Sequence, residues 1–168
     1  MKNLIFINGT MGVGKTTTCR ELQKILSPSV FLDGDWCWDM KPFIVTDETK
    51  KMVTDNICHM LNNFLACPEF QNIIFCWVMH RQEIIDSILE NLNLDETHYY
   101  LFTLTISEQS LQKRFFKDIA RGIRKKDSFI ESSNRLSLYE EMDSTKIDVS
   151  DMTAKEAAGM IALEFGRV

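Results

Sequence analysis

Residues 9–16 read Gly-Thr-Met-Gly-Val-Gly-Lys-Thr, and they follow the apolar run Asn-Leu-Ile-Phe-Ile-Asn of residues 3–8. The eight residues fit the pattern GxxxxGK followed by Ser or Thr. The run before them predicts a buried strand, and the spacing of apolar residues after them predicts a helix. Glycine lets the backbone wrap around phosphate oxygens at φ angles that a Cβ disfavours, and the start of a helix directs free N–H groups at an anion. This context predicts a phosphate-binding loop rather than a structural glycine turn.

The side chains of this loop indicate a nucleoside triphosphate as its ligand. Lys15 is expected to reach the β- and γ-phosphates, and the hydroxyl of Thr16 is expected to ligate Mg²⁺. We therefore predict ATP and Mg²⁺ as cofactors. The residues of the loop that we predict to contact the nucleotide are Gly9, Met11, Gly12, Val13, Gly14, Lys15, Thr16 and Thr17.

Strand-like and helical patterns alternate along the chain. Such alternation predicts a three-layer α/β fold, in which a five-stranded parallel sheet has helices on both faces. With 168 residues and no linker, the chain is expected to form a single domain over residues 1–168. The predicted strands are 3–8, 30–33, 72–79, 99–106 and 146–149, and the predicted helices are 15–26, 46–66, 84–92, one that starts at 107 and carries a basic segment, 131–142 and 152–165.

The composition is that of a soluble globular protein, with 45% hydrophobic and 26% charged residues. A net charge of −5 argues against non-specific binding to nucleic acids or to anionic membranes. The apolar runs fall short of the ~20 residues of a membrane span and no signal peptide is visible, so a cytoplasmic monomer or homodimer is expected.

The five cysteines have no CxxC spacing and are expected to be buried free thiols rather than a zinc site.

Two aspartates come at the carboxyl end of the second predicted strand, in the stretch Phe-Leu-Asp-Gly-Asp-Trp of residues 31–36. Ligands of open α/β sheets bind outside such strand ends. A carboxylate there can orient or deprotonate a hydroxyl that accepts a phosphoryl group, so we predict that Asp35 is the base. A plain Asp-Gly turn is the alternative. Trp36 either stacks on a planar or sugar-like acceptor or packs in the core, and the sequence favours neither.

Basic residues are in excess between residues 113 and 126, where seven of them stand against one acidic residue. Apolar residues recur there every four positions, and Arg114, Arg121 and Arg124 fall on another face of the predicted helix. Arginines that close over a γ-phosphate stabilise its charge and exclude water. We therefore predict a lid within about residues 112–130, with Arg121 and Arg124 catalytic and Arg114 on the adenine side or at the lid base. A solvated helix face is the alternative.

The phosphate loop, the Asp-x-Asp of the second strand, the arginine-bearing segment and the ending Ile-Asp-Val-Ser of residues 147–150 resemble the small P-loop kinases. These include shikimate kinase, gluconate kinase, adenylate kinase and chloramphenicol phosphotransferase. The resemblance covers nearly the whole chain and implies a P-loop NTPase fold with a helical lid. It also implies that Asp33 lies near Mg²⁺, that Asp35 contacts the substrate hydroxyl and that Arg81 holds a phosphate or carboxylate of the acceptor. His80 is expected to be a polar residue that lines the acceptor pocket.

The third predicted strand departs from the best-known kinase patterns. It ends in Trp-Val-Met-His-Arg at residues 77–81, where adenylate kinases carry an acidic residue and then Gly-Phe-Pro-Arg, and shikimate kinase carries Gly-Gly-Gly. We expect a Mg-ATP-dependent phosphotransferase that moves the γ-phosphate to a small-molecule acceptor, and favour a hydroxyl because Asp35 is placed as a base. The alternatives are a nucleoside monophosphate kinase, which Arg81 supports, and an ATP-binding regulatory module with little transfer activity.

Overall fold

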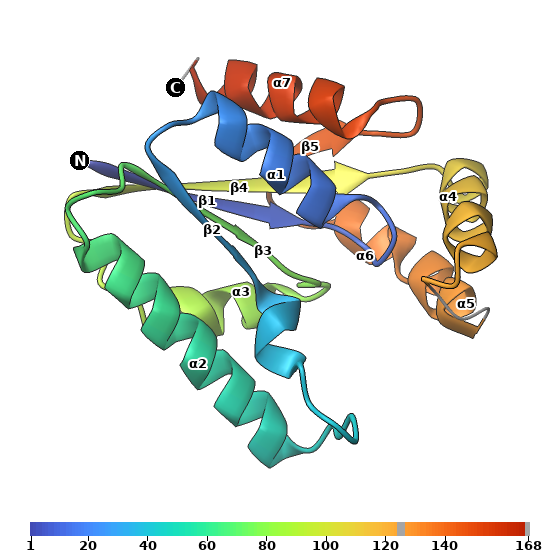
Figure 1. Ribbon diagram of the computed structural model, residues 1–168, viewed down its shortest axis with the longest axis horizontal. Coiled ribbons are helices and arrows are strands. Elements are labelled where there is room, and N and C mark those ends of the chain that lie inside the picture. The colour runs from blue at the N-terminus through green and yellow to red at the C-terminus, as the bar shows by residue number, and fades with distance from the viewer. Residues whose placement is uncertain (124–126, 167–168) are drawn as a thin grey trace.

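Five parallel strands form the central layer of the protein, whose computed structural model describes residues 1–123 and 127–166. These strands are β1 (Lys2–Asn8), β2 (Ser29–Asp33), β3 (Asn72–Cys76), β4 (Thr97–Thr105) and β5 (Thr145–Asp148). They stand in the order β2-β3-β1-β4-β5 (Figure 1). The chain therefore builds the sheet on one side of β1 before it crosses to the other side. That reversal places the carboxyl end of β1 at the point where α/β sheets bind ligands.

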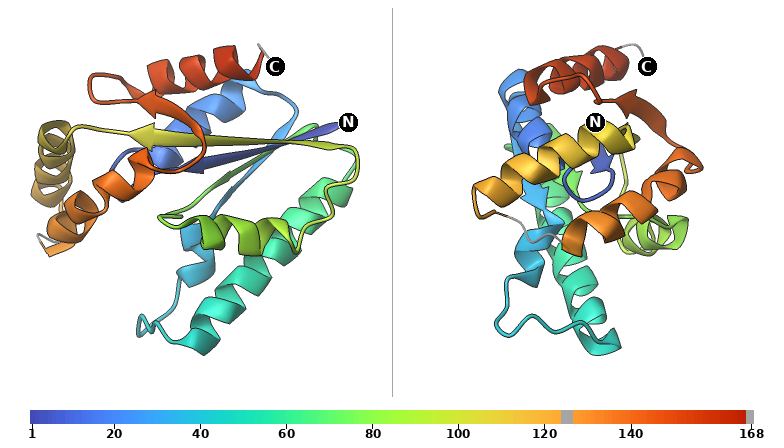
Figure 2. Two further views of the ribbon diagram at one scale, coloured as in Figure 1. Left: turned by 180° about the vertical axis from the view of Figure 1, so that it is seen from behind. Right: turned by 90° about the vertical axis from the view of Figure 1, so that its right-hand side faces the viewer.

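Helices cover both faces of the sheet, which gives the three layers that the sequence predicts (Figures 1 and 2). Helices α1 and α7 lie on one face, and α2 and α3 lie on the other. Helices α4 and α5 lie beyond the carboxyl ends of the strands, and α6 follows α5 toward β5. The helix bounds are α1 Lys15–Ile25, α2 Asp47–Ala66, α3 Gln82–Leu89, α4 Glu108–Ala120, α5 Asp127–Asn134, α6 Leu136–Glu140 and α7 Ala154–Phe165, with a 3-10 turn, η1, at Gly34–Trp38.

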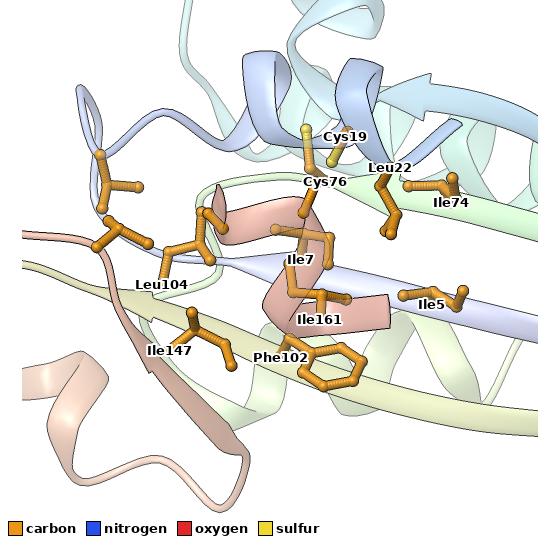
Figure 3. Close-up of a cluster of buried hydrophobic side chains, with 14 of the residues drawn as sticks. Ile5, Ile7, Cys19, Leu22, Ile74, Cys76, Phe102, Leu104, Ile147 and Ile161 are labelled. Carbon is orange, nitrogen blue, oxygen red and sulfur yellow. The ribbon is translucent and has the colours of Figure 1, made fainter. Parts of the chain in front are cut away.

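The core has two apolar clusters, one on each face of the sheet. Ile5 and Ile7 point toward α1 and α7, where they meet Leu22 (Figure 3). Leu4 and Phe6 belong to the second cluster, with side chains of α2 and α3. Successive residues of a strand face opposite sides, so a strand covered on both faces is apolar throughout. This explains the unbroken apolar run that precedes the phosphate loop.

Local sequence signals set several helix ends. Thr46 caps α2 in a capping box with Thr49, and Thr153 caps α7 in a capping box with Glu156. In both, the side chain accepts from a backbone N–H of the first turn, which would otherwise lack a partner. Helix α1 ends at Ile25, three residues before Pro28, which cannot continue a helix.

The predicted α/β class, five parallel strands and two covered faces are confirmed, but three predicted elements are wrong in extent. The third strand ends at Cys76, because Met79 uses its backbone N–H and carbonyl to bind a side chain of β1. The helix predicted to carry the whole basic segment ends at Ala120, and Gly122 then has a φ of +71°. The helix predicted over 131–142 is two helices, α5 and α6, separated by Arg135.

All five cysteines lie in the described part of the chain and are free thiols. Cys19, Cys58 and Cys76 are buried as expected, whereas Cys37 and Cys67 are half-buried. Across residues 1–123 and 127–166, no helix combines the length and apolar character needed to span a bilayer.

Candidate active site

The phosphate loop joins the end of β1 to the start of α1 and packs closely against α4. Gly12 has a φ of +84°, and a Cβ on it would lie 2.4 Å from Cε2 of Phe115, so α4 packs directly on the loop. Gly14 precedes the first turn of α1, and no side chain among the described residues caps that turn. The free N–H groups of the turn can therefore bind an anion.

Lys15 lies across the loop that it follows. Its Nζ donates to the carbonyl oxygens of Gly9 at 2.9 Å and Thr10 at 3.1 Å, and the side chain is largely buried. An ammonium group held at the mouth of a loop with free N–H groups adds positive charge at the place where the helix dipole is also positive. The loop is thus equipped to bind a polyphosphate.

The carboxyl end of β2 brings an aspartate to the hydroxyl that follows Lys15. Oγ1 of Thr16 donates to Oδ2 of Asp33 at 2.6 Å, and Asp33 is 5% exposed. The other oxygen, Oδ1, accepts from the backbone N–H of Asp35 at 3.1 Å and so fixes the turn η1. A hydroxyl and a carboxylate side by side fit Mg²⁺, which takes one or two protein oxygens and completes its shell with waters and phosphates.

Asp35 stands two residues beyond Asp33 and is exposed, whereas Asp33 is buried. The two carboxylates therefore have separate environments: Asp33 points to Thr16, and Asp35 stays at the surface of the turn. Trp36 follows Asp35 and is 48% exposed, so the core-packing alternative does not describe this indole.

The segment after β3 is tied to the base of the phosphate loop by one buried amide. Asn8, which is fully buried, donates through Nδ2 to the carbonyl of Met79 at 2.8 Å, and its Oδ1 accepts from the Met79 N–H at 3.0 Å. This pair of hydrogen bonds holds the backbone next to His80 and Arg81. The last residue of β1 thereby positions the segment that carries both predicted acceptor residues.

His80 and Arg81 lie on the side of the site that faces α5 and α6. Burial, then the positive charges of Arg135 and Arg81, lower the pKa of His80. Its Nδ1 is buried and has no hydrogen-bond partner among the described residues. Arg135 forms an ion pair with Glu131, and Arg81, the residue before α3, is exposed. The structure thus places the imidazole of His80 near the guanidinium groups of Arg135 and Arg81.

Arg114 reaches from α4 to the opposite side of the phosphate loop. Its Nη1 donates to the carbonyl of Val13 at 2.6 Å, and its Nη2 donates to those of Val149 and Met152. Burial lowers the pKa of this guanidinium. Arg114 therefore fastens the loop to the segment after β5.

Helix α5 is attached to the phosphate loop by hydroxyl groups. Oγ1 of Thr10 donates to the carbonyl of Ser132 at 2.8 Å, and Oγ of Ser132 donates to the carbonyl of Met11 at 2.5 Å. Phe129 packs edge-on against Phe115 at 5.5 Å between ring centroids. Helix α5 thus contacts the phosphate loop through Ser132, two residues beyond the predicted lid, and contacts α4 through Phe129.

Of the arginines predicted for the lid, Arg114 lies within α4. Arg121 directly follows α4 and is exposed, and Arg124 lies outside the described residues. Of the predicted loop contacts, Val13 and Lys15 are buried, Met11 is half-buried and Thr17 is exposed.

Sequence reasoning missed several residues that build the site. In the sequence, Asn8 is only the last residue of an apolar run, although an Asn at the end of a buried strand indicates a specific hydrogen-bond partner. Ser132 and Trp77 gave no signal, since their contacts to Thr10 and Gly34 join distant parts of the chain.

A parallel sheet in the order 2-3-1-4-5 with a phosphate loop after its first strand defines a P-loop NTPase of the small-kinase type. The sequence profile of the AAA domain family matches residues 5–136, and the chain belongs to this family. No curated protein matches the chain by sequence.

Solved structures with the same fold include several small kinases. The tunicamycin resistance protein of Deinococcus radiodurans is 18% identical with a TM-score of 0.70, over 99% of this chain and 96% of that one. Shikimate kinase from Acinetobacter baumannii, in complex with shikimate, is 16% identical with a TM-score of 0.66, over 99% and 94%. A gluconokinase from Sinorhizobium meliloti is 14% identical with a TM-score of 0.65, over 98% and 95%. The resemblance to the small P-loop kinases is confirmed for the fold.

Proposed function

We propose that this protein is a Mg-ATP-dependent phosphotransferase that moves the γ-phosphate of ATP to a hydroxyl of a small-molecule acceptor. One observation carries the proposal: a phosphate loop and an aspartate pair meet at the carboxyl ends of β1 and β2, where Thr16 and Asp33 are 2.6 Å apart. Asp35 adds a second carboxylate to the same turn, two residues beyond Asp33. The kinase structures that share the fold support this reading.

In the proposed reaction each residue has a separate task. Lys15 and the first turn of α1 bind the β- and γ-phosphates, and Thr16 and Asp33 hold Mg²⁺, which neutralises phosphate charge when bound. The acceptor oxygen forms a bond to the γ-phosphorus while the bond to the β–γ bridging oxygen breaks, and ADP leaves. Asp35 takes the proton of the acceptor hydroxyl. Arg121, the residue directly after α4, contributes positive charge over the transferred group.

The test is an ATP-consumption screen with sugars, shikimate-like acids, nucleosides, nucleotides and aminocyclitols as acceptors. With the best acceptor, Asp35→Asn should lower kcat by about 10²-fold or more, because a general base is removed, while the Kd for ATP measured by calorimetry stays the same. Asp39→Asn is the matched control, an exposed aspartate four residues further along that should leave kcat unchanged. Unchanged turnover in Asp35→Asn would rule out this base.

A nucleoside monophosphate kinase is a second candidate, and the placement of Arg81 and Arg135 beside His80 supports it. Two guanidinium groups on the acceptor side suit an acceptor that carries a phosphate. The same screen separates the two candidates, because only this second enzyme would prefer nucleoside monophosphates over nucleosides. ATP binding without turnover of any acceptor would favour a regulatory module instead.

A further inference from the structure

Two backbone carbonyls of the phosphate loop are held by side chains from the helices beyond the strand ends (Figure 2). Nη1 of Arg114, in α4, donates to the carbonyl of Val13 at 2.6 Å. Oγ of Ser132, in α5, donates to the carbonyl of Met11 at 2.5 Å. These contacts join residues that are 101 and 121 positions apart in the sequence. The loop is thus held from outside at two of its peptide groups.

Each of these contacts also sets the direction of a backbone N–H group. The N–H and the carbonyl of one trans peptide group point to opposite sides. The carbonyl of Met11 belongs to the same peptide group as the N–H of Gly12, so Ser132, which bonds to that carbonyl, turns this N–H away from α5. Successive N–H groups that converge in a loop form an anion-binding concavity. The hydroxyl of Ser132 therefore orients one of the donors that this loop offers to a phosphate.

The Ser132 hydroxyl is itself fixed by its surroundings. Ser132 is 2% exposed, and Thr10, which lies next to it, is 1% exposed. Oγ1 of Thr10 lies 2.8 Å from the carbonyl oxygen of Ser132 and 2.8 Å from its Oγ. Since the one hydroxyl hydrogen of Ser132 goes to Met11, Thr10 is the donor in both contacts. A buried hydroxyl that donates and accepts in this way has one defined orientation.

Apolar packing brings α5 to the same loop by a second route. Phe129 packs edge-on against Phe115 at 5.5 Å between ring centroids. Phe115 in turn fills the space next to Gly12, where a Cβ would lie 2.4 Å from its Cε2. Apolar packing has no preferred direction, whereas a hydrogen bond weakens steeply when it is bent. Phe129 therefore supplies contact, and Ser132 supplies the orientation.

We propose that Ser132 is a positioning residue of the phosphate loop, which holds the N–H of Gly12 in the direction that binds phosphate. Docking of α5 is then a part of phosphate binding, and by linkage a bound phosphate group stabilises the docked helix. This role rests on the proposed function, but only on its nucleotide site and not on the acceptor or on the transfer step.

The first test is calorimetry with ADP and inorganic tripolyphosphate as probes. Ser132→Ala removes the donor to Met11, and the Kd of each probe should rise by about threefold to tenfold, the effect of one hydrogen bond. Both probes should respond alike, because phosphate groups are all that they share. A rise in Kd for ADP alone would place the effect at the nucleoside and overturn the role of Ser132, as would an unchanged Kd for both probes.

Ser133→Ala is the matched control, because it removes a neighbouring hydroxyl that fastens α5 to another element. Oγ of Ser133 donates to Oε1 of Glu108, in α4, at 2.7 Å. This variant should leave the Kd of both probes unchanged. An equal rise in Ser132→Ala and Ser133→Ala would mean that α5 acts only by being attached, which overturns an orienting role of Ser132.

A second pair of variants covers the case in which urea unfolding shows Ser132→Ala to be unfolded. Thr10→Val removes the hydroxyl that holds Ser132 and leaves the loop backbone in place, whereas Thr10→Ser retains that hydroxyl. The Kd of tripolyphosphate should rise in Thr10→Val and not in Thr10→Ser. The same Kd in both variants would overturn the role of Ser132.

Hydrogen exchange tests the reciprocal effect. Tripolyphosphate should slow amide exchange in α5 (Asp127–Asn134) of the unaltered protein and should leave α5 of Ser132→Ala unchanged, with α2 as the internal reference. Attachment without orientation would instead give the same slowing in both proteins. Slowing of α5 that persists in Ser132→Ala, or that is absent from the unaltered protein, overturns the role of Ser132.

The acceptor screen separates this role from the proposed function. If Ser132→Ala weakens tripolyphosphate binding as expected and no acceptor is turned over, the phosphotransferase is ruled out and the role of Ser132 stands. If an acceptor is turned over and Ser132→Ala and Ser133→Ala bind both probes alike, the role of Ser132 is overturned and the phosphotransferase stands.

Discussion

Neighbouring residues of the phosphate loop point to different parts of the site. Lys15 bonds to the loop's own carbonyls, and Thr16 bonds to Asp33 of the next strand. One turn of helix therefore holds an ammonium group across the loop and a hydroxyl against the carboxylate of Asp33. Lys15 and Thr16 point to different partners because successive side chains at the start of α1 leave the helix about 100° apart.

Lys15→Ala should abolish transfer, with kcat lowered by about 10²-fold or more, because positive charge near the transferred phosphoryl group is lost. Steady-state kinetics with the best acceptor measure the change. Lys24→Ala is the control on the same helix, since Lys24 is exposed and pairs only at the surface with Glu21. If kcat survives in Lys15→Ala, the phosphate loop is not the site of transfer.

At this scale the sequence predicts where the phosphate loop lies, between β1 and α1, but not the residues that support it. Lys15, Thr16 and Asp33 occur in short patterns whose chemistry is local, and the structure brings the last two together. The partners of Asn8 and Thr10 are 71 and 122 residues away, so only the folded chain reveals them. Whether Asp35, Arg81 and Arg121 act on substrate remains a prediction that the proposed variants test.

Among the elements, α4 differs most from its prediction. Periodic apolar positions correctly indicate its buried face, where Leu111 and Phe115 lie in the core. The pattern could not indicate its end, because the basic residues after Ala120 are good helix formers and continue the apparent periodicity. Gly122 decides the end, with a positive φ that an L side chain adopts only at a cost.

Two glycines allow a matched test of that conclusion. A Cβ on either Gly122 or Gly159 meets no atom within 4 Å, so substitution by Ala changes backbone preference alone. Gly122→Ala should lower the free energy of unfolding by about 1 kcal/mol, because its φ is +71°. Gly159→Ala, inside α7, should raise it by about 0.5–1 kcal/mol. Urea unfolding measures the free energy of unfolding of both variants. Changes of the same sign would show that the positive φ of Gly122 does not determine the effect of its substitution.

For the molecule as a whole, Arg114 joins segments that are far apart in sequence. Its three acceptors are Val13 in the phosphate loop, Val149 after β5 and Met152 before α7. The first and last parts of the chain are thus held against α4 by one guanidinium. The sequence predicts a position at the adenine side or lid base, whereas its bonds to three backbone carbonyls follow only from the fold.

Arg114→Ala should therefore destabilise the whole domain, with a free energy of unfolding lower by about 2–3 kcal/mol, because buried carbonyls lose a charged donor. Lys117→Ala, an exposed basic residue of the same helix, should change it by less than about 0.5 kcal/mol. Denaturant unfolding followed by circular dichroism measures both variants. If both variants lost the same free energy of unfolding, the basic charge of α4 would stabilise the domain and the carbonyl contacts of Arg114 would not.

The buried amide of Asn8 also bears on how acceptor specificity can diverge among proteins with this fold. Because Asn8 links the phosphate loop to Met79, a substitution that shifts residues 77–81 also disturbs the nucleotide side. The loop that ends at Thr46 has its hydrogen bonds within itself and α2. Residues 39–45 can therefore vary in sequence without the loss of a hydrogen bond that Asn8 makes to the segment after β3.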